Sequence, residues 1–185
     1  NGERRSNGNG RSSTPPSARP VEPSPRRFWV GGATGFLGSH LVSLLRSRGH
    51  EVVGVSRRGG EVDALRVAAL DVSDAEAVAQ SAKGCDGAFL ATGKVSRDPA
   101  DAEELHRQNV VATREALIGL ERAGVRRVVY ASTSGTLAVS EDPARIADEE
   151  ASAPMELIGR WPYYRSKHYA EREALDANAP PRFEV

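Results

Sequence analysis

Cysteine is almost absent from the sequence, because Cys85 is the only one in 185 residues. A single thiol excludes an internal disulfide and a metal site built from several thiolates, and it fits the reducing interior of a cell. We therefore expect a cytoplasmic protein in which Cys85 is a small, half-buried apolar residue.

Long apolar runs are missing as well. No stretch approaches the roughly 20 apolar residues that a membrane-spanning helix needs, and the first residues contain no apolar core of a secretory signal. Histidine is scarce, and the four residues show no metal-ligand spacing: His40, His50, His106 and His168. These absences predict a protein with neither a membrane segment nor a metal site.

The chain has no net charge, because 25 basic residues balance 25 acidic ones, but the charges are unevenly distributed along it. Residues 1–27 hold six arginines, five prolines, five serines, two glutamates and no aromatic residue. Such a segment cannot bury enough apolar surface to fold, so we interpret it as a disordered tail. Its arginines and serines also resemble a transit peptide, but its prolines interrupt any amphipathic helix. Residues 28–185 keep 19 basic and 23 acidic residues, and this charge of −4 disfavours general nucleic-acid binding.

From residue 28 onward, short apolar runs alternate with longer segments of helical periodicity. Strands are predicted at 27–31, 51–56, 65–70, 87–92 and 126–132, with a sixth beginning at 182–185. Helices are predicted from residue 36 to Gly49, before Gly84, over 100–123 and over 162–177. Strands separated by such helices predict an α/β fold with a doubly wound parallel sheet of the Rossmann type.

The segment VGGATGFLG (30–38) lies between the first predicted strand and the first helix, and three of its glycines are three residues apart. Gly32 would permit a tight turn, Gly35 would let backbone approach a diphosphate, and Gly38 would let the helix pack closely on the strands. The free N–H groups and the positive dipole end of that helix favour an anion. The pattern therefore predicts a dinucleotide-binding turn.

The end of the second predicted strand indicates which dinucleotide would bind. An NAD site commonly has a carboxylate there for the ribose 2′-hydroxyl, whereas this chain has Ser56, Arg57 and Arg58. Two guanidinium groups favour a 2′-phosphate, so we expect NADP, with NAD as the alternative. Asp71 and Val72, after the third strand, are expected to lie at the edge of the adenine.

Six segments in order and spacing point to a known family: VGGATGFLG, LDVSD, GCDGAFLATGKVS, NVVAT, AGVRRVVYASTSGT and YYRSK. Together they resemble the extended short-chain dehydrogenase/reductases, and within them the NAD(P)-dependent epimerase/dehydratase group near dihydroflavonol-reductase-like and 3β-hydroxysteroid-dehydrogenase-like members. The resemblance covers residues 28–185. Gly31 stands where a threonine is usual, and Leu90 where a histidine is common; neither is a reacting group.

The resemblance implies a catalytic set of Tyr163, Lys167 and Thr133, with Ser132 as the neighbouring candidate for the hydroxyl. Tyr163 and Lys167 are four residues apart, which places both on one helix face, and we expect the ammonium to lower the pKa of the phenol. Asn109 is implied as a structural neighbour. The implied cofactor-binding residues are Gly32, Thr34, Gly35, Phe36, Leu37, Gly38, Ser56, Arg57, Arg58, Asp71, Val72, Ala91, Thr92, Gly93 and Lys167.

The implied function is hydride transfer between a nicotinamide and a carbonyl or alcohol, with the tyrosine as general acid or base. Two alternatives stay open: a sugar-nucleotide epimerase or dehydratase of the same family, and a non-catalytic NADP-binding sensor or assembly module. Extended members continue beyond this point into a substrate-binding portion. We therefore expect an amino-terminal piece, inactive by itself, whose whole protein takes a small-molecule substrate and can form a homodimer.

Overall fold

The alternating strand and helix segments fold into one six-stranded sheet in the order β3-β4-β2-β1-β5-β6, as seen in a computed structural model that describes residues 24–185. All neighbouring strands pair in parallel except β3 and β4, which are antiparallel. The strands are β1 (Arg27–Gly31), β2 (Glu51–Ser56), β3 (Gly60–Val62), β4 (Leu65–Ala69), β5 (Gly87–Leu90) and β6 (Val128–Tyr130). The expected tail falls outside the described residues as far as residue 23.

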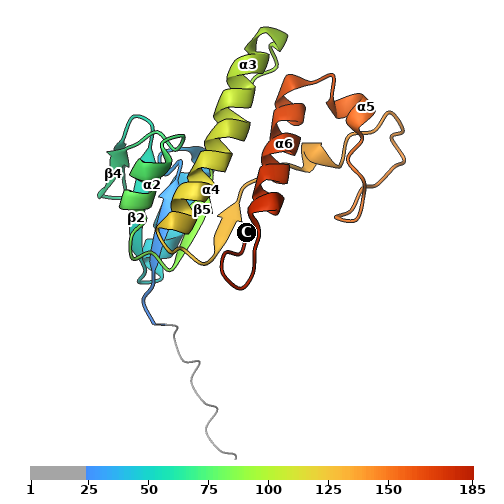
Figure 1. Ribbon diagram of the computed structural model, residues 1–185. Coiled ribbons are helices and arrows are strands. Elements are labelled where there is room, and N and C mark those ends of the chain that lie inside the picture. Colours follow the sequence, from blue (N-terminus) through green and yellow to red (C-terminus); the bar gives the residue numbers. More distant parts are fainter. Residues whose placement is uncertain (1–23) are drawn as a thin grey trace, which may run out of the picture.

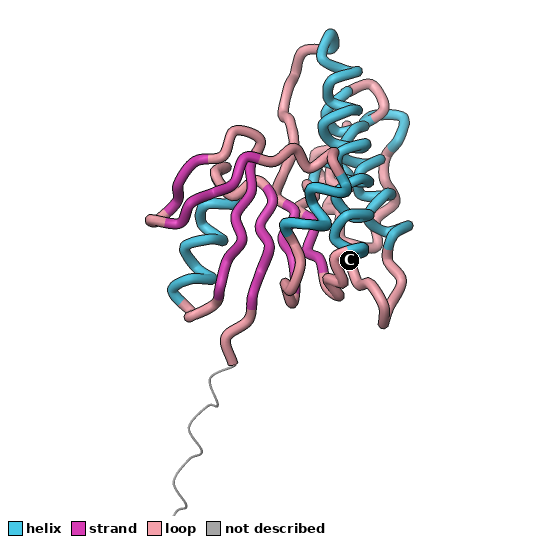
Figure 2. Tube along the Cα trace, turned by 60° about the vertical axis from the view of Figure 1, so that its left-hand side comes forward, coloured by secondary structure: helices cyan, strands magenta, loops and turns pink. Residues whose placement is uncertain are grey.

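Helices cover both faces of this sheet, which confirms the doubly wound Rossmann-type fold. The helical segments are α1 (Phe36–Ser47), α2 (Ala75–Ser81), α3 (Ala102–Leu105), α4 (Ala112–Arg122), α5 (Met155–Ile158) and α6 (Pro162–Ala177), with the short turns η1 (Pro99–Asp101), η2 (His106–Val111) and η3 (Ser134–Thr136). Figure 1 shows α4 and α6 side by side along the sheet, and Figure 2 shows the strands as one twisted layer beside the stacked helices.

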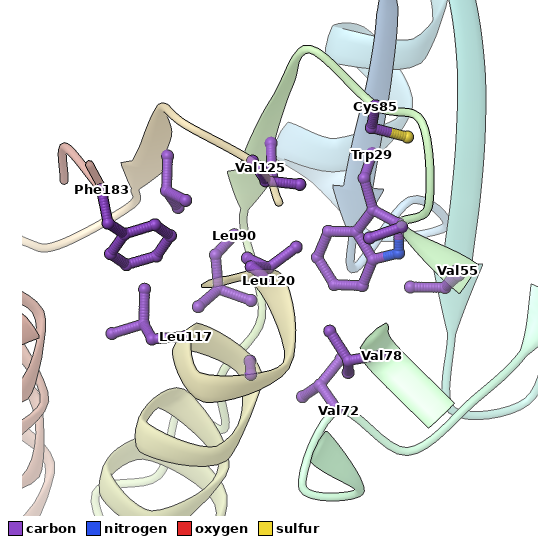
Figure 3. Packing of buried hydrophobic residues seen from close by; sticks show 14 of the residues in the cluster. Trp29, Val55, Val72, Val78, Cys85, Leu90, Leu117, Leu120, Val125 and Phe183 are labelled. Carbon is purple, nitrogen blue, oxygen red and sulfur yellow. The ribbon is translucent and has the colours of Figure 1, made fainter. Parts of the chain in front are cut away.

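Two apolar cores, one on each face of the sheet, hold these layers together. The larger core joins α2, α4 and α6 to the strands, with Trp29 and Phe183 completely buried in it (Figure 3). The smaller core joins α1 to the other face through Val30, Val42 and Val67. Because both faces of β1 and β2 are covered, these strands need apolar residues at successive positions, as the sequence has them. Within residues 24–185, no helix has the length and apolar character that crossing a membrane requires.

The strand β3 was not expected from the sequence. It forms a hairpin with β4 in which Val62 pairs with Leu65, so the loop has only two residues, Asp63 and Ala64. Both have positive φ angles, 47° and 59°. Such a turn usually has Asn-Gly or Asp-Gly, so Asp-Ala gives little sequence signal. The hairpin extends the sheet on the side of β2 where the two arginines lie.

The expected long helix over 100–123 is interrupted. The 3-10 turn η1 and the short α3 precede a π-helical segment, η2, which leads into α4. A π-turn accommodates one extra residue and often occurs at functional sites. Here it includes the buried Asn109.

The expected sixth strand at 182–185 is present only as isolated bridges. Glu184 pairs in parallel with Arg127, and Phe183 pairs with Ala179. The adjoining β6 is shorter than the predicted 126–132, and Val129 on it is 52% exposed.

Candidate functional site

The parallel strands end at one edge of the sheet, where the chain forms a hollow of about 560 Å³. Four strand ends meet there, because the turns after β1, β2, β4 and β5 all line it. This is the edge at which doubly wound sheets bind their ligands. The lining residues are Gly32, Thr34, Gly35, Ser56, Arg57, Arg58, Gly59, Leu70, Asp71, Val72, Ala91, Thr92, Gly93, Gln108 and Ala112.

The glycine turn after β1 is shaped by close backbone contacts. Gly32 has a φ of +78°, and a Cβ atom there would lie 2.5 Å from the carbonyl oxygen of Ala91. A Cβ atom on Gly38 would overlap the carbonyl oxygen of Gly32 and approach the Cα atom of Ala33. Only glycine therefore lets the turn adopt its positive φ and lets α1 approach it this closely.

Gly35 is the N-cap of α1, and no side chain caps this helix end. The first N–H groups of a helix have no acceptor within the helix, and they create a partial positive charge. A Cβ atom on Gly35 would meet only the Gly32 carbonyl, at 3.2 Å, so the outer side of the turn is open. These features fit a diphosphate lying over Gly35. Phe36, Leu37 and Gly38 belong to the first turn of α1 and are not among the residues that line the hollow.

The end of β2 brings the two predicted arginines to the same hollow. Arg57 and Arg58 are exposed there, and within residues 24–185 neither forms an ion pair. The Ser56 hydroxyl donates to the carbonyl oxygen of Gly59 (3.1 Å) and closes the turn that leads to β3. Asp71 faces them: hydrogen bonds from the backbone and hydroxyl of Ser73 lower the pKa of Asp71, and Arg57 contributes to the same shift.

A second hollow of about 180 Å³ continues from the first along the end of β5. Ala91, Thr92 and Gly93 line both hollows, and the second adds Ser132, Tyr163 and Lys167. The two hollows are thus adjacent, and the second connects the predicted cofactor site to the predicted catalytic residues on α6. Thr133 does not line this hollow, whereas its alternative Ser132 does.

Lys167 is buried, with 5% of its surface exposed, and its ammonium group is held by β6. Its Nζ donates to Tyr130 Oη at 2.6 Å and to the Ala131 carbonyl oxygen at 2.8 Å, and it lies 4.3 Å from the centre of the Tyr130 ring. Burial lowers the pKa of Lys167 to about 8, and the negative charge of Glu171 acts in the opposite direction.

The phenol of Tyr163 differs from the sequence expectation. Its pKa is raised, first by burial and next by Tyr164, while an interaction with the Thr133 hydroxyl lowers it. Lys167 is not among the groups that shift this pKa, and its ammonium group is hydrogen-bonded to Tyr130 and Ala131. Tyr163 and Lys167 lie on one face of α6 as expected, but the ammonium group of Lys167 contacts the end of β6.

Asn109, in the π-helical segment, joins three parts of the site. Its amide nitrogen donates to the Lys94 carbonyl oxygen (3.0 Å) and to Ser166 Oγ (2.9 Å), and its amide oxygen accepts from Lys94 N (2.7 Å). Ser166 Oγ in turn donates to the carbonyl oxygen of Tyr163 (2.7 Å). Asn109 therefore fixes the end of β5 and the first turns of α6 relative to each other.

On the far side of Tyr163, a third hollow of about 610 Å³ opens between the segment after β5 and the start of α6. Its lining is largely apolar, with Val95, Val139, Trp161 and Pro162, and Arg97 supplies one positive charge. Val95 and Trp161 are 73% and 54% exposed. Tyr163 therefore lies between the second hollow and this largely apolar one.

Sequence reasoning missed several lining residues and two partners. Gly59, Leu70, Gln108 and Ala112 also line the first hollow. Leu70 and Ala112 lie within the segments LDVSD and NVVAT, which were the signal that could have found them, whereas Gly59 and Gln108 lie outside the six segments. Tyr130 and Glu171 contact the predicted catalytic residues or their loop. Glu171 follows Lys167 by four residues, and this helical spacing was the one signal that could have found it.

Comparison with known proteins agrees with this geometry. Residues 29–183 match the model of the NAD dependent epimerase/dehydratase family. A putative dihydroflavonol 4-reductase of Synechocystis sp. is 37% identical over 156 residues, which is 81% of this chain and 44% of that protein. The 4-hydroxy-2-methyl-3-oxo-4-farnesyl-3,4-dihydroquinoline-1-oxide ketoreductase of Stigmatella aurantiaca is 33% identical over 161 residues, 83% of this chain and 46% of that protein.

Among solved structures, MoeE5 in complex with UDP-glucose and NAD is similar, with a TM-score of 0.70 and 30% identity over 85% of this chain and 51% of that chain. The chain thus spans about half the length of the proteins that it matches. Because the family model covers residues 29–183, which is most of the sequence, the chain belongs to the NAD dependent epimerase/dehydratase family.

Proposed function

We propose that the protein is an NADP-dependent reductase that converts a ketone or aldehyde to an alcohol. The observation that supports this most is the continuity of the first two hollows. Ala91, Thr92 and Gly93 line both, so a dinucleotide with its diphosphate over Gly35 would extend along them towards Tyr163. Arg57 and Arg58 would bind the 2′-phosphate at the opposite end.

In this proposal NADPH, held over Gly35 and beside Arg57 and Arg58, would supply the hydride that the carbonyl carbon of the substrate accepts. Tyr163 Oη would donate its proton to the carbonyl oxygen, so that the hydride and the proton together convert the carbonyl group to an alcohol. A proton donor must be in its neutral form, and the burial that raises the pKa of Tyr163 favours that form of the phenol. The Thr133 hydroxyl would hold the same oxygen, and Lys167 would bind the nicotinamide ribose from its place beside β6.

Two observations favour a reductase over an epimerase. The similar proteins from Synechocystis sp. and Stigmatella aurantiaca are named as reductases, at 37% and 33% identity. The hollow beyond Tyr163 is mainly apolar, which suits an apolar carbonyl compound better than a hydrated sugar. The epimerase alternative is supported by the similarity to MoeE5, which was solved with UDP-glucose and NAD.

NADPH consumption separates the two candidates. We expect the full-length protein to oxidise one NADPH for each molecule of ketone or aldehyde reduced, followed by the loss of absorbance of the reduced nicotinamide. An epimerase returns the hydride to its substrate and consumes no NADPH overall. Conversion of a UDP-sugar without net oxidation of the cofactor would replace our proposal by the epimerase.

The two arginines after β2 give the first testable prediction. Replacing both Arg57 and Arg58 by alanine should weaken NADPH binding by about 10- to 100-fold, because a hydrogen bond to a charged group is worth about 1.5–3 kcal/mol. NADH binding should change by less than about threefold, because NADH has no 2′-phosphate. Titration of each dinucleotide, followed by nicotinamide fluorescence, measures both affinities.

Arg48→Ala is the matched control, because Arg48 is an exposed arginine at the end of α1 that does not line the hollow. It should leave both affinities unchanged. Equal losses for NADPH and NADH in the double variant would show that these arginines do not select the phosphate.

A further inference from the structure

Glu171 lies on the same face of α6 as the two predicted catalytic residues. Tyr163, Lys167 and Glu171 follow one another at intervals of four residues, so their side chains form a row along the helix. Lys167 and Glu171 in this row contact the end of β6 and the loop that follows it. The first two residues have roles in the proposed function, and the third has none.

The carboxylate of Glu171 contacts the loop that holds Thr133. Ser132 Oγ donates to Glu171 Oε2, and the Thr136 hydroxyl lies 3.1 Å from the same oxygen. The Thr136 hydroxyl is also 2.9 Å from the carbonyl oxygen of Thr133. Glu171 therefore holds the residue on one side of Thr133 and the turn η3 on the other.

The negative charge of the same carboxylate raises the pKa of the buried Lys167. Two neutral groups contact the ammonium, Tyr130 Oη and the Ala131 carbonyl oxygen. The other titratable groups around it are the phenol of Tyr163 on α6 and that of Tyr130 on β6, while α4 contributes the neutral hydroxyl of Thr113 beside Tyr130. Glu171 is thus the negative charge that favours the protonated form of Lys167.

We propose that Glu171 is a positioning residue of this site: its carboxylate fixes the loop 131–136 so that Thr133 lies beside Tyr163, and its charge faces the ammonium of Lys167. The inference rests on the proposed function for its catalytic meaning. Its two physical parts, the order of the loop and the titration of Lys167, do not depend on turnover.

The sequence offers a direct probe, because the chain has only three lysines: Lys83, Lys94 and Lys167. A sample labelled with carbon-13 at the lysine ε-carbons gives three side-chain NMR signals, and a pH titration without cofactor or substrate follows each of them. Glu171→Gln keeps an oxygen acceptor for Ser132 but removes the charge. We expect the midpoint of Lys167 to fall by about 0.5 to 1 pH unit, because loss of a nearby negative charge disfavours the ammonium.

Loop order is measured in a second variant, Glu171→Ala, by amide hydrogen exchange. The N–H groups of Thr136, Leu137 and Ala138 are bonded within η3 and just after it. Without the carboxylate they should exchange about 10-fold faster, since a hydrogen bond to a charged group is worth about 1.5 kcal/mol or more. In the full-length protein, kcat should fall about 10-fold while the Kd for NADPH stays within about twofold.

Glu173→Gln and Glu173→Ala are the matched controls, because Glu173 is two residues further along α6 and pairs with Arg114 instead. They should leave the Lys167 midpoint and the loop exchange as in the native protein. The proposal is overturned if Lys167 titrates at its native midpoint in Glu171→Gln, or if η3 exchanges as slowly in Glu171→Ala as in Glu173→Ala. If both Glu171 variants change as expected but the native full-length protein shows no turnover, the proposed reductase is contradicted and the positioning role of Glu171 is not.

Discussion

Phenylalanine at position 163 is expected to reduce kcat of the full-length protein by at least about 100-fold, because general acid catalysis by one side chain contributes about 10²- to 10⁴-fold. The substitution removes only the phenol oxygen, and Tyr163 is partly exposed, so the fold should not change. The Kd for NADPH should stay within about twofold. Steady-state rates and a binding titration on the same preparation measure the two quantities.

Tyr164→Phe is the control for this experiment. The two rings are neighbours, with centroids 5.4 Å apart, and both residues line the apolar hollow beyond β5. Tyr164, however, packs its ring against Gly135 and has His168 rather than a lysine four residues later. It should retain most of its activity. If Tyr163→Phe remains as active as Tyr164→Phe, the proton donor is another group.

Alanine at position 38 is expected to have the largest effect on stability. Its Cβ atom would overlap the carbonyl oxygen of Gly32, which is backbone and cannot rotate away. Either α1 or the turn must move, at a cost of about 1–3 kcal/mol or more in the free energy of unfolding. A chain of this size loses about 2–4 °C in Tm for each kcal/mol, which thermal unfolding can resolve. NADPH affinity should fall as well, because the displaced helix end forms the diphosphate site.

Gly124→Ala separates this clash from the ordinary cost of replacing a glycine. Gly124 has a φ of +80°, but nothing lies within 4 Å of an added Cβ atom. Alanine there costs about 1–2 kcal/mol of backbone strain and should not alter NADPH affinity. If both variants lose the same cofactor affinity, the loss in Gly38→Ala does not come from a clash with the turn.

The sequence predicted those parts of the protein that depend on local patterns. The glycines of 30–38 indicated the turn because their spacing reflects contacts within that turn. The four-residue interval indicated that Tyr163 and Lys167 share one helix face. The arginines after β2 indicated one end of the first hollow for a similar reason, since a strand followed by a turn places its next residues at the sheet edge.

Contacts between distant segments could not be predicted in this way. Lys167 binds Tyr130, which lies 37 residues earlier on another element, and burial by the surrounding segments raises the pKa of Tyr163; neither contact is visible in the local sequence. The hairpin of β3 was missed because Asp63 and Ala64 form a turn that usually contains glycine. The π-helical segment has no distinctive composition, and it depends on the burial of Asn109 against Lys94 and Ser166.

That irregular segment also sets the angular phase between α3 and α4. Each residue of a regular helix turns the chain by about 100°, so removing one residue from 106–111 would restore an unbroken ladder and rotate everything before it. Leu105, now fully buried at the end of α3, would rotate away from its present position relative to the buried face of α4, on which Leu117 and Leu120 pack. The one extra residue of the π-helical segment therefore lets Leu105 before it and the apolar face of α4 after it both be buried. It also directs the amide of Asn109 towards Lys94 and Ser166.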